Sequence, residues 1–132
     1  MLPNWLYGKS KSKLASILGI DELAHKSDII TLSARKNDSI IDNFNIKVRK
    51  QYNAVYISGY FSAKVAANKN DLLFTISGLT FLDANDHFYA SMISSSGEPS
   101  FAEIFSDGTV KLGNQNGIKE SFYIITAAFL VN

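Results

Sequence analysis

From residue 28 onward, apolar side chains recur at alternate positions, and this period constrains the fold more than any other feature of the chain. It is the period of a β-strand, whose successive side chains point to opposite faces of a sheet. Runs of this kind fall at residues 30–35, 44–49, 55–61, 72–77, 87–93, 101–105, 109–112 and 122–131. Turn-forming Asn, Asp, Gly and Ser residues separate most of them. The pattern predicts an all-β fold, an antiparallel β-sandwich or jelly roll of about eight strands.

Two glycines carry local predictions within this pattern. The segment Ser106-Asp107-Gly108-Thr109 joins two of the runs, and Asp-Gly accepts the positive φ angles that a two-residue hairpin turn requires. We therefore expect a two-residue hairpin at this segment. Gly59 interrupts the run at residues 55–61, and a glycine inside a strand is typical of a β-bulge.

The last run, residues 122–131, is apolar on both of its faces. Because a strand of this kind is normally covered on both sides, we expect a second cover, either from the N-terminal segment or from a neighbouring subunit. The second possibility implies a symmetric homo-oligomer. The candidate subunit-interface residues all lie on one face of the run and are Tyr123, Ile125, Phe129 and Val131.

Residues 1–27 have a different pattern and form a separate N-terminal segment, ahead of a head domain at residues 28–132. Ser10 or Ser12 can cap a short helix, in which Leu14, Ile17 and Leu18 fall on one face. This segment either packs on its own domain or docks onto another chain. The candidate contact residues for such docking are Trp5, Leu6, Tyr7, Leu14, Ile17 and Leu18.

Composition makes an enzyme unexpected. The 132 residues include no Cys, which excludes a disulfide scaffold, a thiolate zinc site and a cysteine nucleophile. His25 and His87 are the only histidines, and the serines occur in no Gly-x-Ser-x-Gly elbow. No apolar run approaches the ~20 residues that cross a bilayer, so we expect no membrane insertion. Lys9 follows the start too closely for a signal peptide, and we expect a chain made in a cytoplasm.

One loop groups oxygen and nitrogen ligands that suit a metal ion: Asp83, Asn85, Asp86 and His87. It lacks the glycine and the distal glutamate of a calcium hand, and Asn and Asp are frequent in ordinary turns. We therefore expect no metal and no cofactor, with this loop as the weak candidate. The nearest approach to a nucleic-acid surface is the group Lys47, Arg49, Lys50 and Tyr52. Charges on the polar face of one strand are usually solvated, and we expect no nucleic acid as partner.

Tyrosines in the predicted strands offer a surface for binding. Their amphipathic rings suit protein contacts and stacking on sugars, although tyrosine is also a good strand residue in its own right. The candidate exposed binding residues are Tyr56, Tyr60 and Tyr89.

Two parts of the chain resemble known proteins. The opening Leu2-Pro3-x-Trp5-Leu6-Tyr7-Gly8-Lys9 resembles the start of small virion proteins of tailed bacteriophages, in which a short N-terminal segment plugs into the particle. The body resembles the β-sandwich heads of phage tail, baseplate and head-fibre proteins. The segments that carry this second resemblance are Val48-Arg49-Lys50-x-x-Asn53-x-Val55-x-Ile57-x-Gly59, Leu73-Phe74-Thr75-Ile76, Ile104-x-x-Asp107-Gly108-x-Val110-x-Leu112 and Phe122-Tyr123-Ile124.

The chain departs from these heads at Ser77-Gly78-Leu79-Thr80-Phe81, where they often carry a Tyr-Arg-Pro segment. The resemblance implies a homotrimeric, non-enzymatic virion protein, a fibre or receptor-binding head. It would attach to other virion proteins through residues 1–27, with a host cell-surface glycan as a candidate partner. Two alternatives stay open: a head-fibre or decoration protein on a phage capsid, and a monomeric carbohydrate-binding module or adhesin. A hydrolase that uses Glu98, Glu103 or Asp107 is a third option.

Overall fold

A computed structural model of the chain describes residues 28–131, and within this range every regular element is a β-strand. All paired strands run antiparallel, which confirms the prediction of an antiparallel all-β fold. The helix predicted in residues 1–27 lies outside the described residues. The nine strands are β1 (Ile30–Leu32), β2 (Ala34–Lys36), β3 (Ile41–Gln51), β4 (Ala54–Ala63), β5 (Leu72–Ile76), β6 (His87–Ser94), β7 (Pro99–Phe105), β8 (Thr109–Leu112) and β9 (Ser121–Leu130).

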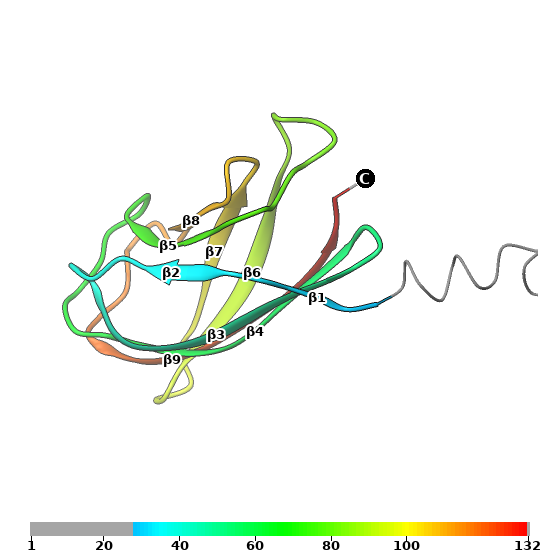
Figure 1. Cartoon of the computed structure of the whole chain (residues 1–132). Helices are drawn as coiled ribbons and strands as arrows, with labels where there is room; N and C mark the ends of the chain where they lie inside the picture. Colours follow the sequence, from blue (N-terminus) through cyan, green and yellow to red (C-terminus); the bar gives the residue numbers. More distant parts are fainter. Residues whose placement is uncertain (1–27, 132) are drawn as a thin grey trace, which may run out of the picture.

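The strands form one sheet that curls until it nearly closes on itself (Figure 1). Their order is β1-β3-β4-β9-β6-β7-β8-β5-β2, so the two strands at the ends of the sheet are consecutive in the chain. Residues 30–35, expected as a single strand, are divided at Ser33: β1 pairs with β3 and β2 pairs with β5. One short stretch of chain therefore links the two ends of the sheet. The separate sheets of a sandwich or jelly roll are not confirmed.

The β7–β8 hairpin forms where the sequence predicts it, but its loop is one residue longer than expected. Gly108 donates its N–H to the carbonyl of Phe105 at 2.9 Å and has a φ of 86°. Asp107 is not among the residues of positive φ. This geometry is a type I turn followed by a left-handed glycine, the usual three-residue hairpin. The two-residue hairpin of the described range joins β3 and β4, where Gln51 pairs with Ala54.

Gly59 lets the backbones of β3 and β4 approach each other closely, and it does not form the expected bulge. The register of β4 is continuous at this position, where Gly59 pairs with Ile46 on one side and Ile125 on the other. A Cβ atom at Gly59 would lie 2.0 Å from the carbonyl oxygen of Asn45, so a side chain does not fit. The irregularity of the β3–β4 pair falls instead between Ile41 and Phe44.

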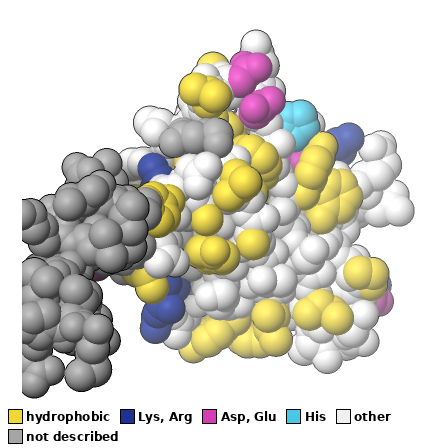
Figure 2. Space-filling view, turned by 90° about the vertical axis from the view of Figure 1, so that its right-hand side faces the viewer, with side chains coloured by type: hydrophobic (Ala, Val, Ile, Leu, Met, Phe, Trp, Pro, Cys, Tyr) yellow, Lys and Arg dark blue, Asp and Glu magenta, His cyan; other side chains and the backbone are white. Residues whose placement is uncertain are grey.

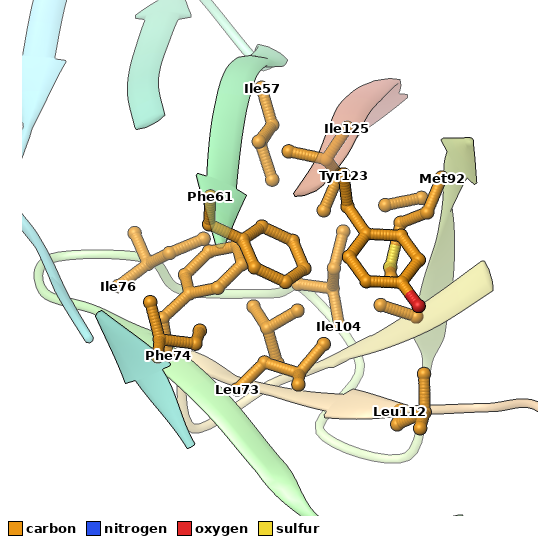
Figure 3. Close-up of a cluster of buried hydrophobic side chains, with 14 of the residues drawn as sticks. Ile57, Phe61, Leu73, Phe74, Ile76, Met92, Ile104, Leu112, Tyr123 and Ile125 are labelled. Atoms are coloured by element: carbon orange, nitrogen blue, oxygen red, sulfur yellow. The ribbon is translucent and has the colours of Figure 1, made fainter. Parts of the chain in front are cut away.

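The core fills the inside of the curled sheet, and every long strand contributes its inward-facing residues to it (Figure 3). Phe61, Phe74 and Ile104 are fully buried there. The ring of Phe61 stacks on that of Tyr123 with 5.5 Å between the ring centroids. Because the residues between them along each strand point outward, one sheet provides both the core and the exposed surface considered next.

Candidate interaction surface

The outward-facing side chains of β4, β9, β6 and β7 make a surface with many exposed apolar groups, called here the outer face. In Figure 2, hydrophobic and uncharged side chains occupy the middle of one side of the molecule and charged side chains lie toward its margins. Scattered single apolar residues are normal on a protein surface, but a contiguous group is typical of an interaction site. The exposed large apolar residues of the outer face are Tyr56, Tyr60, Phe122, Ile124, Leu130, Tyr89, Ile93 and Phe101, each between 38% and 60% exposed.

Strand register aligns part of this group into a continuous row. Tyr60 pairs with Ile124, Ile124 pairs with Ile93, and Ile93 pairs with Pro99, so the row crosses all four strands. Directly paired residues on one face have neighbouring Cβ atoms, which makes the row a contiguous apolar strip. The ring of Phe122 lies beside that of Tyr60, with 5.2 Å between the centroids.

Two of the tyrosines on the outer face are held by hydrogen bonds. Asn45 donates its side-chain N–H to the hydroxyl of Tyr60 at 3.2 Å. His87 Nε2 and the hydroxyl of Tyr89 are 2.9 Å apart, and the ring of Tyr89 also meets that of Phe101 edge-on. Rings fixed in this way lose less side-chain entropy when a partner binds.

Charged side chains border the outer face. On one side, Lys47 and Arg49 are exposed on β3. On the other side, Glu103 pairs across the β7–β8 ladder with Lys111, whose ammonium lies over the ring of Phe105 at 5.3 Å from its centroid. The next row across the four strands is Ser58, Thr126, Ser91 and Phe101, which carries no charge. The arrangement is an uncharged centre with a polar rim, as in many protein interfaces.

The residues predicted for exposed binding and those predicted for a subunit interface occupy opposite sides of the sheet. Tyr56, Tyr60 and Tyr89 are all exposed on the outer face. The interface candidates are on the inward face of β9: Tyr123, Ile125 and Val131 are buried in the core of their own chain, and Phe129 packs against it. These four side chains are therefore packed within their own chain and do not fit the predicted subunit interface, and the residues that β9 leaves exposed are Phe122, Ile124 and Leu130.

Alternation alone identifies two faces of β9 without telling which one points inward. Phe122, Ile124 and Leu130 were consequently missed as surface residues, and so were Ile93 and Phe101. The pairing partner supplies the missing signal, because Phe61 opposite Tyr123 is large and fully buried whereas Tyr60 opposite Ile124 is exposed.

The loop that was the weak metal candidate uses its polar groups to form a turn. Asp83 Oδ1 accepts a hydrogen bond from the N–H of Asn85 at 2.9 Å, and the carbonyl of Asp83 accepts one from the N–H of Asp86. The ring of His87 is directed to Tyr89. Within residues 28–131, no three His, Cys, Asp or Glu side chains gather as a metal site would require. The predicted attachment residues Trp5, Leu6, Tyr7, Leu14, Ile17 and Leu18 lie outside the described residues.

No protein-family model matches the chain, and no curated protein matches it. Across residues 28–131 there is also no helix with the length and hydrophobicity that a bilayer crossing demands.

Proposed function

We propose that the protein is a non-enzymatic structural protein that assembles into a homotrimer through its outer face. The observation that supports this proposal is the uncharged apolar strip across β4, β9, β6 and β7, which remains exposed in the single chain. Its aromatic content is that of interface centres, where Tyr and Phe are enriched and charged residues are depleted.

A second copy of the chain is the occupant that this surface suits best. In symmetric assemblies, related surface patches of identical subunits meet around an axis, so a charge near the axis faces its own copy. Like charges that face each other in an interface are costly. The central rows of the outer face carry hydroxyl and apolar groups only, while Lys47, Arg49 and Glu103 lie toward its edges.

The resemblance to small virion proteins of tailed bacteriophages gives this proposal its particular form. The protein would be a fibre or receptor-binding head of a virion, displayed on the particle and held to other virion proteins through residues 1–27. A capsid head-fibre or decoration protein is the alternative within the same class. Reconstruction of a phage particle that contains the chain separates these forms, because the sheet would fit density on the tail in one case and on the capsid in the other.

The oligomeric state tests the proposal directly. Light scattering of the purified full chain should give about three times the 14.6 kDa of one subunit. A clean monomer at micromolar concentration contradicts the homotrimer and favours a monomeric carbohydrate-binding module or adhesin. A glycan array then tests that rival.

A matched pair of variants tests whether the outer face is the interface. Ile124 is 52% exposed in the middle of the apolar strip, and Ile124→Lys should dissociate the trimer to monomers. Leu82 is 82% exposed and lies beyond the far end of β9, where its N–H bonds to the carbonyl of Val131. Leu82→Lys adds the same charge and should leave the trimer intact. A trimer that survives Ile124→Lys would assign the contact to another surface.

A further inference from the structure

The interior of the curled sheet opens to solvent at one end through a polar cleft, called here the mouth. It lies where β6 ends and where β7 and β9 begin, and it encloses about 330 Å³. Pockets at the openings of curled sheets are a common place for small ligands. The polar residues around the mouth include Asn68, Glu98, Ser100, Asn116, Lys119 and Tyr123.

The rim of the mouth is held in place by backbone hydrogen bonds. Ala67 and Ile118 form an isolated antiparallel bridge with N–H to carbonyl distances of 3.0 and 2.8 Å. Gly117 precedes this bridge with a φ of 71°, and a Cβ atom there would lie 2.2 Å from the carbonyl oxygen of Ala67. The side chain of Asn114 accepts a hydrogen bond from the N–H of Phe101 at 2.7 Å. A cleft with a fixed rim needs little ordering when a ligand binds.

Tyr123 joins the core to the mouth. Its ring packs in the core beside Phe61, and in Figure 3 its hydroxyl points away from that ring. The hydroxyl donates a hydrogen bond to the carbonyl of Lys119 at 2.7 Å. Burial raises the pKa of Tyr123, the hydrogen bond to Lys119 opposes this rise, and the charge of Glu98 adds to it. The protonated hydroxyl that donates to Lys119 can also accept a hydrogen bond.

Ser100 places a polar group in the mouth without a partner. Its side chain faces inward on β7, in phase with the buried Ala102 and Ile104. Its hydroxyl oxygen is buried and makes no hydrogen bond within the described residues. Buried polar groups are nearly always hydrogen bonded, because an unpaired one has lost its water without compensation. A ligand that reaches Ser100 would supply the missing partner.

We propose that the mouth binds a neutral, polyhydroxylated molecule of the size of one sugar residue. A volume of about 330 Å³ is at the small end of ligand sites. The lining contains one carboxylate, Glu98, and one ammonium, Lys119. Their charges sum to zero, so the lining favours neither an anionic nor a cationic ligand. The side-chain amides of Asn68 and Asn116 each carry both a hydrogen-bond donor and an acceptor, which suits the hydroxyl groups of a sugar.

This inference is independent of the proposed assembly. Ser100 and Tyr123 point to the inside of the sheet, whereas Ile124 and Tyr60 point outward. Pro99, at the end of the apolar strip, is the residue of the strip that also lines the mouth. Failure of one leaves the other standing.

Titration of the full chain with the methyl glycosides of glucose, galactose, mannose and N-acetylglucosamine tests the mouth. Two-dimensional NMR of the ¹⁵N-labelled protein should show saturable shifts of the amides of Ser100, Asn116 and Lys119 with at least one of the four. If none of these amides shifts at the highest soluble concentration of any glycoside, the inference is overturned.

Variants then assign the binding to the proposed groups. Ser100→Ala removes the unpartnered hydroxyl and should weaken binding about tenfold, while Tm stays the same or rises because no native hydrogen bond is lost. Asn116→Ala should also weaken binding. Asn85→Ala, in the exposed turn at the other end of β6, is the matched control and should bind as the native chain does. A native affinity in Ser100→Ala, or a loss in Asn85→Ala, contradicts the assignment.

Discussion

Aromatic rings fill one end of the sheet interior and a cleft opens at the other, although the same strands run through both ends. At one end the rings of Phe88 and Phe129 stack with 4.6 Å between centroids, and Phe81 packs edge-on against both. At the other end the same two strands present Ser94 and Tyr123, and the mouth is open. Phe81 comes from residues 77–86, which connect β5 to β6. The contrast teaches that one pair of strands can fill the sheet interior with aromatic rings at one end and leave a cleft at the other.

Truncation of the aromatic end should cause the largest loss of stability. Phe88→Ala should lower the free energy of unfolding by about 3 kcal/mol, because it leaves a cavity between two rings. Tyr89→Ala, at the next residue but on the outward face, should cost less than about 1 kcal/mol. Urea unfolding of both variants measures the difference. Equal losses would mean that the aromatic end is not a packed part of the core.

The rim of the mouth should be the next most sensitive region. Gly117→Ala should cost about 2 kcal/mol, because the new methyl group meets the carbonyl of Ala67 and the left-handed backbone is strained. Gly97 has a φ of 86° but nothing within 4 Å of its missing Cβ, so Gly97→Ala isolates the backbone strain at about 1 kcal/mol. Thermal unfolding compares the pair. If Gly97→Ala costs as much as Gly117→Ala, the close contact at the rim contributes nothing.

The hydroxyl of Tyr123 should have a smaller effect that depends on pH. Tyr123→Phe removes its hydrogen bond to Lys119 and should cost about 1 kcal/mol at pH 7. Because burial raises the pKa of Tyr123 in the folded chain, the unfolded chain loses this proton first as pH rises above ~10. The native stability should therefore decline above that pH, and Tyr123→Phe should lack this part of the decline. Unfolding free energies at pH 8 and pH 11 give both values, and parallel slopes would contradict the pKa direction.

The smallest effect is expected at the β7–β8 turn, near the aromatic end. The hydroxyl of Thr109 donates to Asp107 Oδ1 at 2.6 Å and, with the Thr109 N–H, lowers the pKa of Asp107. The stabilisation is present above the unfolded pKa of about 4 and is lost as pH falls through the lower folded value. Asp107→Asn keeps the acceptor oxygen, so at pH 7 it should cost less than about 1 kcal/mol at this exposed site. The native chain and the variant should converge in stability near pH 2, and a gap that widens there would reverse the assignment.

Periodicity in the sequence was enough to predict most strands, because alternation of buried and exposed residues is a local property. The runs at 87–93, 101–105 and 109–112 match β6, β7 and β8 within two residues at either end. The division at Ser33 could not be predicted, since each half follows the same alternation and only the pairing partners differ. The single curled sheet was missed for the same reason: strand order is a long-range property.

The candidate site was less predictable than the fold. Tyr56, Tyr60 and Tyr89, predicted as exposed binding residues because their rings are amphipathic, are exposed. The interface residues predicted on β9 lie on its buried face. Both faces of this strand are apolar, so the sequence offers no polar face to indicate which side is exposed. Nothing local marks Ser100 as a ligand group, since the burial and missing partner of its hydroxyl follow from the tertiary fold and not from the neighbouring sequence.

The stretch of chain that links the two ends of the sheet is also where tension from the N-terminal side would first act. A pull that reaches Ile30 acts first on the three residue pairs between β1 and β3, and Ser33 passes the load to the three pairs between β2 and β5. The seven residues 30–36 thus both receive the load and hold the two ends of the sheet together. We expect a chain pulled from its N-terminal side to lose these short pairings before those of the longer strands β3, β4 and β9.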